Sequence, residues 1–82
     1  MNAKEALAEA AAELDRAGCL SPRIDAEWLL ADAIGVSRTD LYADGTRELS
    51  AEDEKAFGAS VARRVAREPL AYILGEWGFR RL

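Results

Sequence analysis

The side chains that could do chemistry in this sequence are few, and they do not form a recognisable catalytic set. Asp25 and Asp32 are seven residues apart, so on one helix they share a face and could bind a metal ion or act in acid–base catalysis. A simpler interpretation is that Asp25 pairs with an arginine of a neighbouring helix. Cys19 is the only cysteine and the sequence has no histidine, so no disulfide, Cys/His zinc site or activated thiolate is predicted.

The glycines and aromatic residues indicate no cofactor site either. The six glycines are scattered through predicted caps, turns and a strand, so they cannot form a Gly-rich phosphate-binding loop. Trp28 and Tyr72 occur at helical spacing, and we interpret them as core aromatics and not as a stacking platform for a cofactor. We therefore predict no catalytic, cofactor-binding or metal-binding residue in this chain.

Charge is distributed unevenly along the sequence. Residues 1–60 hold six basic side chains against thirteen acidic ones, whereas residues 61–82 hold five arginines against two glutamates, and the net charge is −4. An acidic domain repels a phosphate backbone over most of its surface, so direct nucleic-acid binding is disfavoured. An acidic patch on another protein suits the arginines better.

Four arginines are candidate contacts to such a protein partner: Arg63, Arg67, Arg80 and Arg81. Arg63 and Arg67 are four residues apart and fall on the outer face of a predicted helix, while Arg64 lies near the edge of its apolar stripe and could reach a neighbouring helix. Exposed arginines often form only a solvated face. The alternative is that they bind acidic residues of a partner.

Two predicted helices begin the chain. Asn2 is the expected N-cap of the first, whose apolar residues recur at steps of three and four, and Gly18 ends it. Ser21-Pro22 is a strong start signal for the second, which runs to Ile34. This second helix is apolar nearly all round, so we place it at the centre of a bundle.

Two further helices and a short closing segment follow. A short third helix, capped by Ser37 or Thr39, is interpreted as a connector, although a binding loop is the alternative. Ser50 and Asp53 open the fourth helix with a capping box. Its predicted inner stripe is Phe57, Val61 and Val65, and beside it Gly58 and Ala62 would permit close approach of another helix.

The spacing of apolar residues changes at the carboxyl end of the sequence. Pro69 can open a short helix but cannot continue the preceding one, and Gly75 is the predicted end of this closing helix. After it, Trp77 and Phe79 alternate with polar residues, which predicts a strand from residue 76 onward. We expect this to be the first strand of a hairpin.

The predicted fold is therefore all-α: a small bundle of about five helices, four plus the short closing helix, with an exit strand at the carboxyl end. At 82 residues there is room for one core. No apolar run is long enough for a membrane span and no hydrophobic signal core follows Met1, so we expect a cytoplasmic protein without a membrane partner.

Two blocks of the sequence resemble the amino-terminal helical domain of the HemK/PrmC family, the peptide chain release factor glutamine methyltransferases. One is the run Glu68-Pro69-Leu70-Ala71-Tyr72-Ile73-Leu74-Gly75 followed by Phe79. The other is Ser21-Pro22-Arg23-Ile24-Asp25-Ala26-Glu27-Trp28-Leu29-Leu30 and on to Gly35-Val36-Ser37-Arg38. Their order and separation fit the family pattern, and the similarity covers essentially all 82 residues.

The resemblance implies a parent enzyme that uses S-adenosylmethionine to methylate the glutamine in the Gly-Gly-Gln loop of release factors. In the family, the donor site and an Asn-Pro-Pro-Tyr motif come later than this domain; here the only asparagine is Asn2 and the only prolines are Pro22 and Pro69. The chain would then contain no catalytic residue, and its partners would be the release factor and its own carboxyl-terminal catalytic domain.

The resemblance also implies a division of the chain. Residues 1–75 would form the domain that recognises the release factor, and residues 76–82 would start the hairpin leading to the S-adenosylmethionine-binding domain. Trp77, Phe79 and Leu82 would anchor that hairpin. The alternative is a stand-alone helical adaptor without enzymatic activity, and a nucleic-acid-binding bundle ranks third because the surface is acidic.

Overall fold

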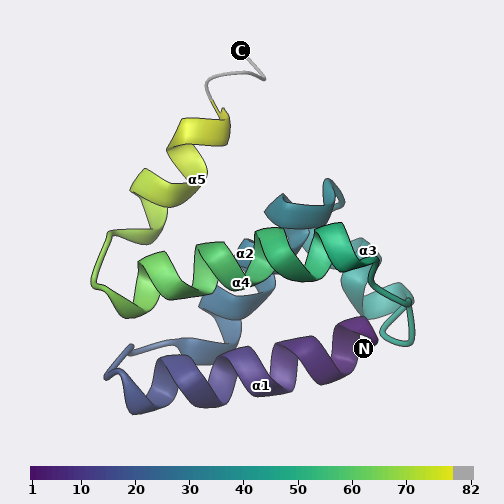
Figure 1. Ribbon diagram of the computed structural model, residues 1–82, viewed down its shortest axis with the longest axis horizontal. Helices are drawn as coiled ribbons and strands as arrows, with labels where there is room; N and C mark the ends of the chain where they lie inside the picture. Colours follow the sequence, from purple (N-terminus) through teal and green to yellow (C-terminus); the bar gives the residue numbers. More distant parts are fainter. Residues whose placement is uncertain (79–82) are drawn as a thin grey trace.

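Five α-helices make up the part of the chain that the structure describes (Figure 1). The computed structural model describes the backbone of residues 1–78 and the side chains of residues 1–74. The helices are α1 (Ala3–Arg16), α2 (Pro22–Ile34), α3 (Arg38–Ala43), α4 (Ala51–Val65) and α5 (Leu70–Gly78). Within residues 1–78 the only strand-like pairing is an isolated antiparallel bridge between Asn2 and Glu48. The predicted all-α bundle is confirmed.

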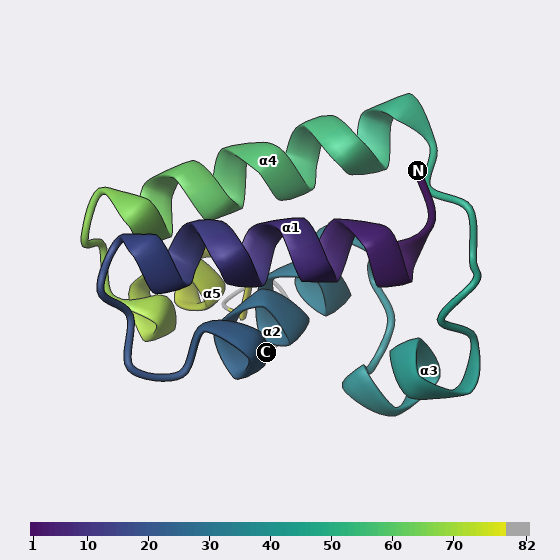
Figure 2. The same cartoon turned by 90° about the horizontal axis from the view of Figure 1, so that it is seen from below.

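Helix α2 lies at the centre of the bundle, as its apolar circumference predicts. It packs against each of the other four helices. Its side chains Ala26, Leu29 and Leu30 are completely buried. Helices α1 and α4 run side by side in the same direction across α2, and α5 leaves the far end of α4 (Figures 1 and 2). The core therefore lies where α1 and α4 meet α2.

The helix ends follow local capping chemistry. Asn2, Ser37 and Ser50 each accept a hydrogen bond from the backbone N–H three residues on, and each forms a complete capping box. Gly18 and Gly35 end α1 and α2 with φ angles of 90° and 73°, which glycine adopts without strain. Ser21 does precede Pro22 at the start of α2, but its hydroxyl makes no capping hydrogen bond.

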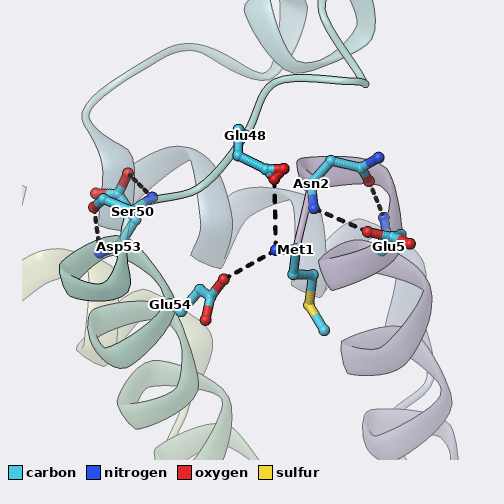
Figure 3. Close-up of polar contacts among 7 residues, drawn as sticks. All are labelled: Met1, Asn2, Glu5, Glu48, Ser50, Asp53 and Glu54. Atoms are coloured by element: carbon cyan, nitrogen blue, oxygen red, sulfur yellow. Dashed lines mark hydrogen bonds and ion pairs between the residues drawn. The ribbon is translucent and has the colours of Figure 1, made fainter.

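The amino terminus is tied to the connection between α3 and α4. The N–H of Ala3 donates to the carbonyl of Arg47 at 2.8 Å, and the N–H of Leu49 donates to the carbonyl of Met1 at 3.1 Å. The Met1 ammonium group lies 3.3 Å from a carboxylate oxygen of Glu54 and 3.5 Å from one of Glu48 (Figure 3). Leu41 and Leu49 are buried, so α3 and the following loop are anchored to the bundle, and the interpretation of this segment as a connector stays a prediction.

The closing helix is longer than the sequence predicts. It does not end at Gly75 but continues through Glu76 and Trp77 to Gly78, so the predicted strand is wrong for residues 76–78. A glycine inside a helix costs only about 1 kcal/mol relative to alanine. A helix also pairs its own backbone groups, whereas a strand needs a partner strand, and residues 1–78 contain none. Residues 79–82 lie outside the described residues.

The two aromatic residues predicted for the core lie at the surface. Trp28 of α2 is 43% exposed and Tyr72 of α5 is 69% exposed. The largest fully buried side chains are the leucines Leu14, Leu29 and Leu30, and the aromatic residue that does belong to the core is Phe57 of α4, which is 5% exposed. Among residues 1–78, no helix has both the length and the apolar character that crossing a lipid bilayer requires.

Candidate protein-interaction surface

One end of the bundle is hollowed where α1 ends, α2 begins and α4 ends. The hollow has a volume of about 330 Å³, and its lining includes Cys19, Leu20, Ser21 and Arg67. Leu20 is completely exposed, although leucine is among the residues most often buried. We call this region the arginine end of the bundle, because Arg64 and Arg67 line it.

Two arginines near the end of α4 are held by carboxylates. Arg63 places Nη2 2.9 Å from Oε1 of Glu68. Arg64 reaches α2, where its Nε lies 3.2 Å from Oδ2 of Asp25, and its Nη1 donates to the carbonyl of Glu68 at 3.0 Å. The predicted pairing of Asp25 with an arginine of the fourth helix is confirmed. Arg63 and Arg64 therefore help to hold the fold together.

Arg67 differs from these two arginines in its backbone and in its surroundings. It ends α4 in the left-handed region, with φ 75°, and it is the one non-glycine residue with positive φ among the described residues. The N–H of Glu68 donates to the carbonyl of Arg63, and the N–H of Arg67 donates to the carbonyl of Arg64. This is a Schellman motif whose left-handed position usually holds glycine. An arginine there costs about 1 kcal/mol or more.

The side chain of Arg67 is exposed and forms no ion pair with any residue of the described part of the chain. Its Nη2 atom lies 3.3 Å from where a Cβ on Gly18 would be. Gly18 therefore leaves room for the guanidinium group at the end of α1, where the helix dipole favours a cation. Of the predicted contact arginines whose side chains the structure describes, Arg67 is the better placed to bind an external carboxylate.

A buried carboxylate on α2 joins α3 to the centre of the bundle. Glu27 is only 4% exposed, and it accepts hydrogen bonds from Tyr42 Oη at 2.7 Å, Arg38 Nη2 at 2.9 Å and Arg23 Nε at 3.2 Å. Burial alone would raise the pKa of Glu27, but these hydrogen bonds outweigh it and hold the pKa below its ordinary value. We call this set the Glu27 clasp.

The Glu27 clasp adjoins the exposed apolar side of α2. The guanidinium carbon of Arg38 lies 5.0 Å from the centroid of the Trp28 ring, which is a cation–π distance. Ile24, one turn before Trp28, is also about half exposed. Glu27 was not predicted from the sequence. Two pairs spaced by four residues, Arg23 with Glu27 and Arg38 with Tyr42, were the available signal.

Two kinds of ligand-binding feature do not occur in the part of the chain that the structure describes. The glycines whose surroundings are described are Gly18, Gly35, Gly45 and Gly58, and each lies in a different element, so no glycine-rich loop forms in this part of the chain. Within the same part, no three or more histidine, cysteine, aspartate or glutamate side chains gather as a metal site.

Comparison with known proteins identifies the family. The family model described as the PrmC N-terminal domain matches residues 5–75, which is most of the chain. The chain belongs to the PrmC N-terminal domain family. The family resemblance seen in the sequence is thereby confirmed.

Curated proteins similar to this PrmC N-terminal domain are named release factor glutamine methyltransferase. The protein from Deinococcus radiodurans is 39% identical over 84 residues, covering 100% of this chain and 30% of the relative. Those from Geobacter sulfurreducens and Caulobacter vibrioides are each 44% identical, covering 76% and 80% of this chain and 22% and 23% of the relatives. The chain thus spans less than a third of these relatives. No solved structure matches it significantly.

The remaining predicted contact residues of this PrmC N-terminal domain lie partly or wholly outside the described residues. Trp77 belongs to α5, but its side chain lies outside the described residues. Arg80, Arg81, Phe79 and Leu82 lie outside them altogether. Their roles stay predictions, as does the domain boundary at residue 75.

Proposed function

We propose that this chain is the release-factor-recognition domain of a protein-glutamine methyltransferase. In this proposal the parent enzyme methylates the glutamine of the Gly-Gly-Gln motif in peptide chain release factors. The observation that carries the proposal is the family match over residues 5–75, together with curated relatives that are named for this activity. The length of those relatives supports placing the reaction in a further domain of the parent protein.

We assign methyl transfer to that further domain and binding of the protein substrate to this one. S-adenosylmethionine would supply the methyl group when bound in the catalytic domain, and the reaction would take place in the cytoplasm. A flexible loop entering a methyl-transfer pocket needs a second, distant contact to fix its approach. Binding energy from that contact can be used for orientation at the reacting atoms. A bundle with a rigid centre is suited to this task.

We place the contact with the release factor at the arginine end of the bundle. Arg67 offers a guanidinium group without an ion pair among the described residues, and Leu20 offers a completely exposed apolar side chain beside it. An acidic side chain next to an apolar one would complement both. Desolvated arginines are frequent anchors of protein interfaces. Arg63, Arg80 and Arg81 remain proposed secondary contacts to the same partner.

The segment that follows α5 is proposed to lead to the catalytic domain. Trp77, Phe79 and Leu82 supply apolar side chains that would anchor this connection. The support is the family match. In addition, Ile73 is the one described side chain of α5 that belongs to the buried core, so α5 is attached to the bundle over a small area.

Arg67→Glu should weaken binding of a bacterial peptide chain release factor to the 82-residue chain by tenfold or more. The substitution replaces an attractive charge by a repulsive one, and a tenfold loss corresponds to about 1.4 kcal/mol. Calorimetric titration with the purified release factor measures the affinity. Arg47→Glu makes the same charge change at the opposite end of the bundle, so it should leave the affinity nearly unchanged.

Arg67→Gly separates binding from folding at the same position. Glycine relieves the left-handed strain, so this variant should gain up to about 1 kcal/mol in stability while still losing affinity. Thermal unfolding followed by circular dichroism measures the first effect. If neither Arg67 variant changed the affinity, the arginine end would not be the contact; if the wild-type chain bound no release factor, the proposed function itself would fail.

A further inference from the structure

A second hollow lies between side chains of α1 and α4. These two helices run side by side in the same direction (Figure 1). It has a volume of about 230 Å³. Its floor is apolar and its rim carries carboxylates. The floor includes Ala6, Ala10, Leu49, Phe57 and Val61, and the rim includes Glu9, Glu13 and Glu54. We call it the α1–α4 groove.

Gly58 lines this groove without being required by the packing of the described chain. It lies in the middle of α4 and is exposed, and a Cβ built on it would meet no atom within 4 Å. The expectation that Gly58 lets another helix of the bundle approach closely is therefore wrong for the described residues. Glycine destabilises a helix interior relative to alanine. The space beside Gly58 is available to a chain from outside.

The rim of the groove is suited to cations. Glu9 and Glu13 are exposed, lie one helical turn apart on α1, and form no ion pair with another residue among those described. Glu54, on the opposite side, already holds a cation, because the Met1 ammonium group lies 3.3 Å from its carboxylate (Figure 3). An occupant with positive side chains would be complementary to Glu9 and Glu13.

The size of the groove favours a piece of protein over a cofactor. Sites for small molecules commonly enclose about 300–1,000 Å³. A hollow of about 230 Å³ suits one or two apolar side chains. Peptide segments that bind in this way lay apolar residues into a groove and place charged residues along its rim.

We propose that the α1–α4 groove binds a basic segment of a protein partner. The segment carries an apolar side chain that enters the groove against Phe57 and Val61. Two lysines or arginines one helical turn apart pair with Glu9 and Glu13. Gly58 allows the backbone of the segment to approach α4 closely. This site is separate from the arginine end, and the inference does not depend on the proposed function.

Two synthetic amphipathic peptides test the charge requirement. Both carry leucines at helical spacing; one has lysines along the flanks of the leucine stripe, and the other has glutamates at the same positions. Titrated into the isotope-labelled 82-residue chain, the lysine peptide should bind at least tenfold more tightly and shift the amide signals of the α1 and α4 residues around the groove. Glu9→Gln combined with Glu13→Gln should weaken its binding about fivefold or more.

Gly58 tests the shape requirement with a matched pair of variants. Gly58→Ala and Gly58→Leu should both raise the melting temperature, because alanine and leucine favour helix more than glycine does. Leucine fills the groove, whereas alanine adds a single methyl group beside the approaching backbone. Gly58→Leu should therefore weaken binding of the lysine peptide at least tenfold, and Gly58→Ala should weaken it by less.

Three results would overturn the inference. They are no binding of the lysine peptide at about 1 mM, equal binding of the two peptides, and equal binding by the two Gly58 variants. Shifted amides that map to the arginine end instead of the α1–α4 groove would also contradict it.

Discussion

Glu27→Ala lowers the free energy of unfolding by about 3 kcal/mol, the expected cost of removing one partner from a buried and hydrogen-bonded ion pair. The substitution leaves Arg38 and Tyr42 without their shared acceptor on α2. It also removes the main polar link between α2 and α3. Urea unfolding followed by circular dichroism measures the change, and Glu13→Ala, at an exposed position on α1, is the matched control and should cost little.

The same carboxylate gives stability a defined dependence on pH. The folded-state pKa of Glu27 lies below its ordinary value, so the unfolded chain binds a proton more readily than the folded one. The stabilisation is therefore complete above the unfolded-state pKa and is lost as the pH falls through the folded-state pKa. Glu27→Gln should lose stability at neutral pH and show a shallower decline on acidification. If the stability of Glu27→Gln declined with falling pH as steeply as that of the wild type, Glu27 would not be ionised in the folded state.

Leu30→Ala is expected to cost about 3–4 kcal/mol, because it leaves a cavity at the centre of the bundle. Leu30 is completely buried on α2, the helix that packs against all four others. A domain of this size has a total stability of roughly 5–10 kcal/mol, so the melting temperature should fall by more than about 10 °C. Differential scanning calorimetry measures both quantities.

Leu20→Ala is the matched control for this cavity. The chemical change is the same, but Leu20 is completely exposed, so the stability should change by less than about 0.5 kcal/mol. Similar losses for the two variants would mean that Leu20 packs against the fold, which would also remove it from the proposed contact surface. Leu20→Ala should still weaken binding of the release factor, since it leaves Arg67 as the main anchor there.

The elements with strong local signals were predictable from sequence. Asn2, Ser37 and Ser50 cap their helices through hydrogen bonds to residues three positions on, so nothing distant is needed to specify these starts. The central place of α2 was also predictable, because a helix that is apolar nearly all round must be surrounded. The pairing of Asp25 with Arg64 followed once these two helices were adjacent.

The sequence-based predictions were wrong or incomplete mainly where the environment of a residue depends on residues far away in the sequence. By its spacing alone Trp28 looks like a core residue, yet it is 43% exposed and Arg38 of α3 lies over its ring. Glu27 looks like an ordinary surface acid until α3 folds back onto it. At the carboxyl end, alternation around Trp77 suggested a strand, but helix is the state that pairs its own backbone groups there.

The tie between the amino terminus and the connection that follows α3 has a consequence for synthesis on the ribosome. Ala3 and Lys4 donate to carbonyl groups of Arg47 and Gly45, which are translated much later. Helix α1 therefore cannot make these contacts until more than half of the domain has left the exit tunnel. Contacts between such distant positions slow folding. Until then, the amino-terminal end of α1 lacks the hydrogen bonds that fix it in the folded domain.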